Sequence, residues 1–172
     1  LFLDKLPNEE IPIPFFRKTK NGNHFDLNVY DTVSLIQRRQ EWLREYLEEN
    51  EFEQLSYVAS FNGGNQNINE IVSAIHALLK LENDWAKHAC DQQHAINLLV
   101  ERMENIGMII CFNSIVGNSG KRKISVDECR GFALTDRYAP FIFVNNGDAK
   151  SAQVFTLIHE MAHILIGFSA GY

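Results

Sequence analysis

Residues 141–167 read FIFVNNGDAKSAQVFTLIHEMAHILIG, and this stretch predicts a strand, a turn and a helix. The first five residues are apolar and β-favouring, which is typical of a strand. Asn146 and Gly147 are a turn signal, Asp148 can cap the start of a helix, and Gly167 can end it. Apolar residues lie on nearly every side of that helix, which predicts that it is buried.

Two histidines and a glutamate interrupt the apolar pattern of this helix. His159 and His163 are four residues apart, so both imidazoles lie on one face and can bind one metal ion. Glu160 lies about 100° further round the helix, near enough to act on a water beside that ion. This H-E-x-x-H spacing is typical of zinc hydrolases. The alternative is a pair of core histidines that hydrogen-bond to backbone carbonyls, since polar groups buried without partners cost several kcal/mol.

The motif predicts a bound zinc ion and, with it, an enzyme that hydrolyses peptide bonds. Catalytic zinc sites hold three protein ligands and a water whose pKa falls to about 7. Glu160 is the candidate general base, which takes the proton of that water and later gives it to the leaving amine. If residues 141–145 form the edge of the sheet, an extended peptide can pair with them, and Phe143 and Asn145 are then the substrate-binding residues. A buried central strand has the same composition, so the sequence leaves both arrangements open.

The third metal ligand is missing from the motif. The elongated motif H-E-x-x-H-x-x-G-x-x-H needs a glycine and a histidine where the chain has Ile166 and Ser169. The other common arrangement takes a glutamate from a later helix, and the residues after His163 are too few to form one. The motif as it stands therefore supplies two ligands and a base, which is an incomplete site. Three acidic residues of the sheet region are further candidates that their spacing does not favour: Asp127, Glu128 and Asp136.

The rest of the chain predicts an α+β fold with a helical N-terminal half. Helical periodicity covers residues 31–50, 67–79 and 91–105. Short apolar runs then predict a small three-stranded, mainly antiparallel sheet, at residues 108–114, 131–135 and 141–145. The basic run at residues 121–123 is expected in a loop between strands.

The domain boundaries follow from the turn-forming residues. Three of the four prolines lie in the first 14 residues, so residues 1–30 are interpreted as a linker or extended lead-in. Residues 31–172 are interpreted as one domain, which the resemblance given below implies is metallopeptidase-like and lacks its C-terminal part. Because the chain begins with Leu1 rather than Met, we expect a piece of a longer protein.

Composition limits the partners and the cellular setting. The chain has 172 residues and 45% hydrophobic content, enough for one domain with a real core. The net charge of −6 argues against direct nucleic-acid binding by this segment. No apolar run approaches the roughly 18 residues needed to cross a membrane. The three widely spaced cysteines fit neither a disulfide framework nor a zinc knuckle, so a reducing, cytoplasmic setting is expected.

Four segments resemble the ImmA/IrrE family of metallo-endopeptidases: residues 107–110, 127–134, 140–145 and 155–163. The resemblance extends over residues 92–172 and is looser over residues 31–60. It implies a zincin-like fold, truncated here, in a cytoplasmic bacterial, phage or plasmid-borne protease. Such an enzyme cuts one regulatory protein, a transcriptional repressor or an antitoxin. An upstream helix-turn-helix domain is also implied, with residues 1–30 as its linker.

The resemblance also implies roles for the motif residues. His159 and His163 match the zinc ligands of the family, and Glu160 matches its catalytic glutamate. Zn²⁺ is the expected cofactor, with Mn²⁺ as the alternative in the cell. The acidic third ligand lies beyond the metal helix in the family, after Tyr172 in this numbering. The alternative function is a non-catalytic, peptidase-like module that binds a repressor or another partner protein without cutting it.

Overall fold

The computed structural model describes residues 13–14, 26–62, 67–82 and 84–172. Its helices are α1 (Leu27–Glu49), α2 (Ile68–Leu78), α3 (Trp85–His88), α4 (Gln92–Asn105) and α5 (Lys150–Ile166). Its strands are β1 (Ile109–Asn113), β2 (Ile115–Val116), β3 (Ser119–Lys123), β4 (Gly131–Leu134), β5 (Phe141–Asn145) and β6 (Ala170–Gly171). The predicted α+β class with a helical N-terminal half is confirmed.

The three predicted strands lie in one mainly antiparallel sheet, as expected, and the structure adds β6 as a fourth strand and makes one of the pairings parallel. Its order is β1-β5-β4-β6, with β1 parallel to β5 and β4 antiparallel to both of its neighbours. The turn signals after residue 114 close a separate antiparallel hairpin, β2–β3, instead of joining two strands of the main sheet. The basic run at residues 121–123, expected in a loop, belongs to β3.

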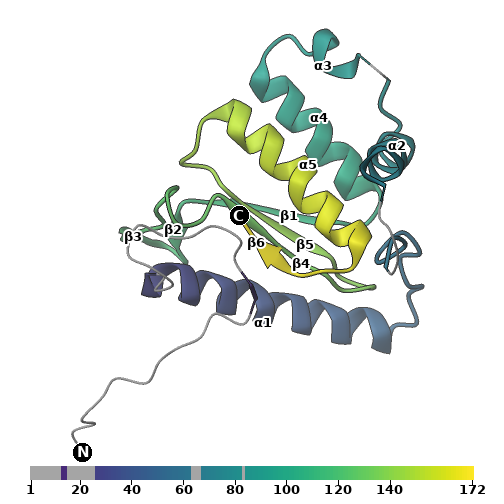
Figure 1. Ribbon diagram of the computed structural model, residues 1–172. Helices are drawn as coiled ribbons and strands as arrows, with labels where there is room; N and C mark the ends of the chain where they lie inside the picture. Colours follow the sequence, from purple (N-terminus) through teal and green to yellow (C-terminus); the bar gives the residue numbers. More distant parts are fainter. Residues whose placement is uncertain (1–12, 15–25, 63–66, 83) are drawn as a thin grey trace, which may run out of the picture.

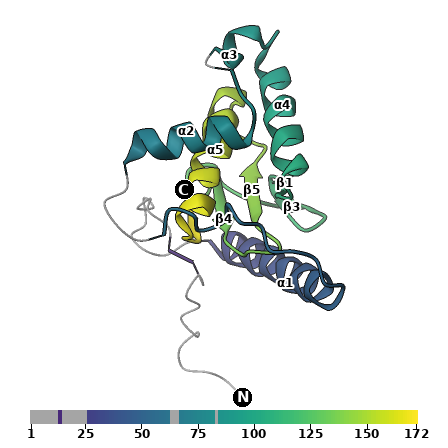
Figure 2. The same ribbon diagram turned by 90° about the vertical axis from the view of Figure 1, so that its right-hand side faces the viewer.

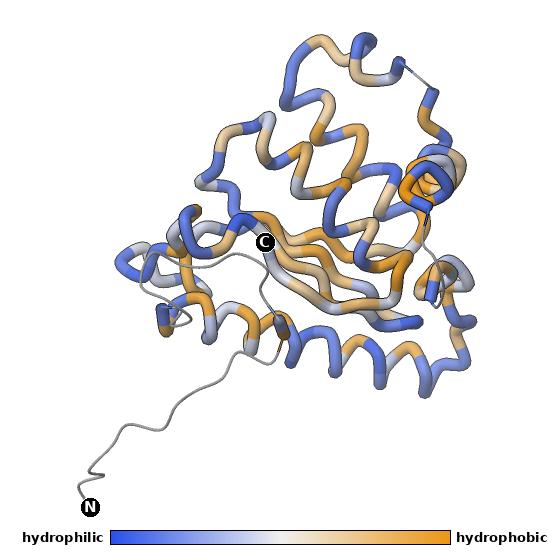
Figure 3. Tube along the Cα trace, in the orientation of Figure 1, coloured by the Kyte–Doolittle hydropathy of each residue, from blue (hydrophilic) through white to orange (hydrophobic). Residues whose placement is uncertain are grey.

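The sheet lies between two helical layers (Figures 1 and 2), with α1 on one face and α2, α4 and α5 on the other. Alternate residues of each strand point to opposite faces. Phe132 and Phe143 stack at 4.9 Å in the core on the α1 side, where Val33 also lies. Ile142 packs with Leu157 in the core on the α5 side. In Figure 3 the hydrophobic residues follow the sheet and the helix faces turned toward it.

Local capping residues set the starts of three helices. Asp26 caps α1, so this helix begins at Leu27, inside the predicted linker 1–30. Asn67 caps α2 and Asp91 caps α4. Most of the predicted linker, residues 1–12 and 15–25, lies outside the described residues. None of the described helices is long and apolar enough to cross a membrane.

Candidate metal centre on helix α5

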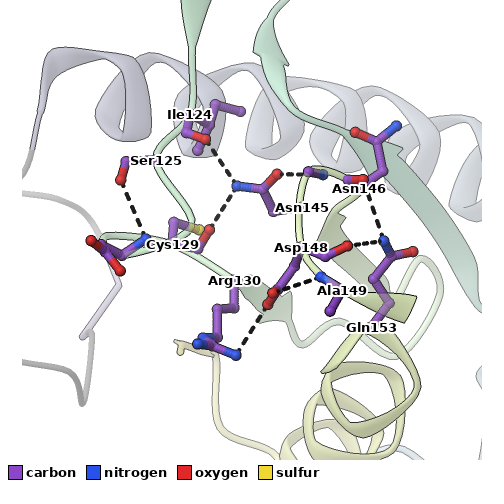
Figure 4. A network of polar contacts seen from close by, with 11 residues as sticks. Ile124, Ser125, Cys129, Arg130, Asn145, Asn146, Asp148, Ala149 and Gln153 are labelled. Atoms are coloured by element: carbon purple, nitrogen blue, oxygen red, sulfur yellow. Dashed lines mark hydrogen bonds and ion pairs between the residues drawn. The ribbon is translucent and has the colours of Figure 1, made fainter. Parts of the chain in front are cut away.

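The start of α5 is tied to the end of β5 by one buried amide (Figure 4). Asn145 Nδ2 donates to the carbonyl oxygens of Ile124 and Cys129, both at 3.0 Å, and its Oδ1 accepts from Gly147 N at 3.0 Å. The side chain is fully buried. Three hydrogen bonds inside the protein thus hold the turn before α5 against the loop that leads into β4.

The predicted N-cap of α5 is wrong by one residue. Ala149 occupies the cap position and makes no side-chain cap bond. Asp148 instead accepts from Ala149 N at 2.8 Å and forms an ion pair with Arg130, with 3.1 Å between Oδ2 and Nη1. Gln153 ties the first turn of α5 to the turn before it, since its Nε2 donates to Asp148 O at 2.7 Å. The helix start is therefore fixed by contacts with the sheet region (Figure 4).

Two glycines allow α5 to pack closely at both ends. A Cβ on Gly131 of β4 would collide with Thr156 of α5 and lie 2.6 Å from the Phe143 carbonyl oxygen. Gly167 ends the helix in the left-handed region, at φ +85°, as predicted. A Cβ there would lie 2.6 Å from the Cβ of Ala59. Helix α5 is thus held rigidly over β4 and β5.

The two motif histidines are already placed as metal ligands would be. Their Nε2 atoms are 3.2 Å apart, and the rings meet edge to face. Two nitrogens bound tetrahedrally to zinc at 2.0–2.1 Å are separated by about 3.3 Å. The same distance also suits a hydrogen bond between two neutral imidazoles. Burial lowers the pKa of both rings, and the charge of His159 lowers that of His163 further. The neutral form, which binds cations, is therefore favoured.

Glu160 is a fully buried carboxylate, and neither of its oxygens has a hydrogen-bond partner within the part of the chain that the structure describes. Burial raises its pKa well above the usual range. The nearby backbone amide of Ala133 in β4 lowers the pKa of Glu160, but by less than burial raises it. This amide does not meet the geometry of a hydrogen bond to either carboxylate oxygen. A buried acceptor without a partner is costly, and a water held by a metal ion is a partner of the right kind. The donor set and this orphaned carboxylate therefore fit zinc.

The structure brings no third ligand to the histidine pair. Among the described residues, no further His, Cys, Asp or Glu places a ligand atom within 4.8 Å of both imidazoles. The three acidic candidates of the sheet region are therefore not placed as ligands. Asp136, for example, accepts from the Tyr138 and Ala139 amides in the turn before β5. The one described group with metal-ligand spacing, Glu82, Asp84 and His88, is exposed and lies at α3.

The proposed substrate contacts at Phe143 and Asn145 are corrected by the topology. Strand β5 is central, paired with β1 on one side and β4 on the other. Phe143 is 1% exposed and Asn145 is fully buried, so neither can contact a peptide at a sheet edge. The strand on the far side of β4 is β6, and it is this edge that lies beside α5.

Three aromatic residues lie beside the histidines, and the sequence did not identify them as part of the site. Phe155 stacks on His159 with ring centroids 5.5 Å apart, and Tyr172 lies 5.1 Å from the same imidazole. Phe168 lies 6.4 Å from His163. Phe155 precedes His159 by four residues, so helical spacing could have identified it. No local pattern places Tyr172, which reaches the site only because the chain returns along β4.

The fold and the site together define an α+β domain with two imidazoles and a buried carboxylate on one sheet-packed helix. No family model, curated protein or solved structure matches this chain. The resemblance of the four segments to the ImmA/IrrE family therefore supports a proposal about function and does not assign the chain to that family.

Proposed function

We propose that this chain is a zinc-dependent endopeptidase, or the part of one that carries the zinc-binding helix. The observation that carries the proposal is the 3.2 Å separation of His159 Nε2 and His163 Nε2, on a helix that also holds the buried Glu160 carboxylate with no hydrogen-bond partner among the described residues. The distance between the two nitrogens matches that of two ligands of a tetrahedral zinc ion. The carboxylate follows His159 directly on the same helix.

The residues divide the chemistry of peptide-bond hydrolysis among them. A zinc ion bound at this position supplies a Lewis acid, which polarises the scissile carbonyl and acidifies a water. His159 and His163 hold the ion in their neutral forms. Glu160 takes a proton from the attacking water and delivers it to the leaving amine. Its buried environment raises its affinity for that proton, which suits a group that must hold the proton between the two steps.

The proposed substrate is a regulatory protein, a transcriptional repressor or an antitoxin, in the cytoplasm. The support for this part is the resemblance to the ImmA/IrrE family. The third ligand is proposed to lie beyond Tyr172, since no described residue supplies it. Zn²⁺ is the proposed cofactor, and Mn²⁺ is the alternative metal.

Metal binding and cleavage test the proposal separately. Calorimetric titration with zinc should show one site that His163→Ala removes. Glu160→Gln should keep zinc but lose cleavage of the repressor or antitoxin encoded beside the gene. Glu101→Gln, which removes an exposed carboxylate on α4, is the matched control and should cut normally. The proposal fails if zinc does not bind, or if Glu160→Gln still cleaves. If a chain extended beyond Tyr172 binds zinc no more tightly than this one, the proposal that the third ligand lies there is wrong.

A non-catalytic binding module is the second candidate. Two observations favour it: the described residues contain only two ligands, and β6 already occupies the outer edge of β4. Such a module would form a stable complex with the regulatory protein and leave it intact with zinc present. Gel analysis of the mixture over time distinguishes this result from cleavage.

A further inference from the structure

The outer edge of β4 carries a short segment of the chain itself (Figure 1). Gly131 N donates to Tyr172 O at 3.1 Å, and Tyr172 N donates to Gly131 O at 2.9 Å. The Arg130 amide donates to the same Tyr172 oxygen at 2.7 Å. Strand β6 continues this antiparallel ladder. Residues 170–172 therefore lie on β4 as an added peptide strand would lie.

The side chain of Tyr172 points toward α5. Opposed residues of an antiparallel pair share a face of the sheet, and Tyr172 is opposite Gly131, whose missing Cβ would meet α5. The Tyr172 ring centroid accordingly lies 5.1 Å from His159 and 5.9 Å from Phe155. An aromatic side chain on an extended strand thus contacts one of the two candidate zinc ligands.

Phe155 is exposed although it takes part in this contact. Its side chain is 55% exposed, and Phe168 beside His163 is 43% exposed. Single exposed apolar residues are ordinary on protein surfaces, but apolar groups gathered at one site indicate binding. Phe155 stacks on the His159 ring at an interplanar angle of 24°. The two rings together therefore offer an aromatic surface to a third ring, which Tyr172 takes in this structure.

We propose that Phe155 and His159 form a recognition position for an aromatic side chain of the peptide substrate, and that Tyr172 shows how this side chain is held. The inference rests on the proposed function and names a feature of its substrate. A substrate strand pairs with β4 in place of residues 170–172. Main-chain hydrogen bonds then hold the peptide whatever its sequence, and the aromatic position selects the residue next to the cleaved bond.

Paired peptides test the selectivity. Two fluorescence-quenched peptides share a polar sequence of Ala, Gly and Ser and differ at one position, Tyr or Ser. With zinc-loaded protein, kcat/KM should be about tenfold higher for the Tyr peptide, as expected for one buried aromatic contact. Phe155→Ala should reduce this ratio to about twofold, and Phe155→Tyr should restore it. Phe52→Ala is the control, because Phe52 is equally exposed, at 56%, and lies outside the site.

Tyr172→Ala tests the internal occupant. Both peptides must displace residues 170–172, so removing the competing ring should lower KM severalfold and by a similar factor for the Tyr and Ser peptides; an unchanged KM for both would mean that the substrate does not take the place of this segment. Binding of both peptides to zinc-loaded Glu160→Gln, measured by fluorescence anisotropy, gives the same comparison without cleavage. Circular dichroism checks that each variant is folded.

The outcomes separate this inference from the proposed function. Cleavage of both peptides at equal rates, or an unchanged ratio in Phe155→Ala, overturns the aromatic position and leaves the peptidase proposal standing. If the protein binds zinc and the peptides but cleaves neither peptide, the peptidase proposal is overturned. The aromatic position is then kept if the ratio of the two peptide affinities, measured by anisotropy, depends on Phe155. Absence of zinc binding and of peptide binding overturns both.

Discussion

Replacing Glu160 with glutamine should stabilise the metal-free protein. The carboxylate is fully buried and neither oxygen has a hydrogen-bond partner. In the unfolded chain the same group is ionised and hydrated at neutral pH. Folding must therefore either bury an unpaired charge or protonate the group, and both cost free energy. Glutamine has nearly the same shape and carries no charge, so it avoids most of this cost.

The size of the effect follows from the burial. A buried charged group without a partner costs several kcal/mol, and a neutral polar group costs about 1–3 kcal/mol. The difference predicts that Glu160→Gln raises the free energy of unfolding by about 1–3 kcal/mol at pH 7. In a chain of 172 residues each kcal/mol changes Tm by about 2–4 °C, so Tm should rise by about 2–12 °C.

The pH dependence has a definite sign. Because burial raises the folded pKa of Glu160 above its ordinary value of 4.5, this group binds more protons in the folded protein than in the unfolded chain between those two pKa values. The contribution of Glu160 to the stability of the wild type therefore falls as pH rises above about 4.5. The gain in the free energy of unfolding from Glu160→Gln should be absent near pH 4 and should increase as the pH rises. The nearby Cys129 thiol stays neutral, since burial and the Glu160 charge raise its pKa.

Urea unfolding of both proteins in EDTA, followed by circular dichroism between pH 4 and 8, measures the difference. Glu101→Gln controls for loss of a charge at an exposed position and should change stability by less than about 0.5 kcal/mol. If Glu160→Gln is less stable than the wild type at pH 7, the carboxylate has a stabilising partner and the reasoning is refuted.

Three further changes probe the frame around the site. Gly131→Ala should destabilise the fold by about 1–3 kcal/mol, measured by urea unfolding, because the new Cβ would lie 2.6 Å from a β5 carbonyl oxygen. Gly120→Ala is the control: its new Cβ would meet no described atom within 4 Å, so stability should hardly change. Asn145→Ala removes three buried hydrogen bonds and should cost about 2–4 kcal/mol; a loss below 0.5 kcal/mol would mean that water replaces them. Iodoacetamide should alkylate exposed Cys90 in the native protein and reach buried Cys129 only on unfolding, which mass spectrometry of digests would show.

The helices and the metal motif were accessible from sequence because their signals are local. Caps at Asn67 and Asp91, and the glycine stop at Gly167, act within one helical turn. The spacing of His159 and His163 is a property of one helix. These signals placed both imidazoles on one face of one buried helix.

The sheet order was not accessible in the same way. An apolar run such as residues 141–145 is the same in a central strand and in an edge strand, and only pairing with β1 and β4 decides between them. The turn signals after residue 114 were real, but they close the β2–β3 hairpin. Strand β6 has two residues, too few for any periodic pattern.

The sequence by itself thus determined the class of fold and the chemistry of one helix, because helical spacing and capping depend on neighbours within a few residues. The tertiary structure decided that β5 is central, and it brought Tyr172 back along β4 to His159. It also decided that Glu160 has no hydrogen-bond partner among the described residues. These features depend on contacts between distant segments, and no periodicity along the chain encodes which segments meet.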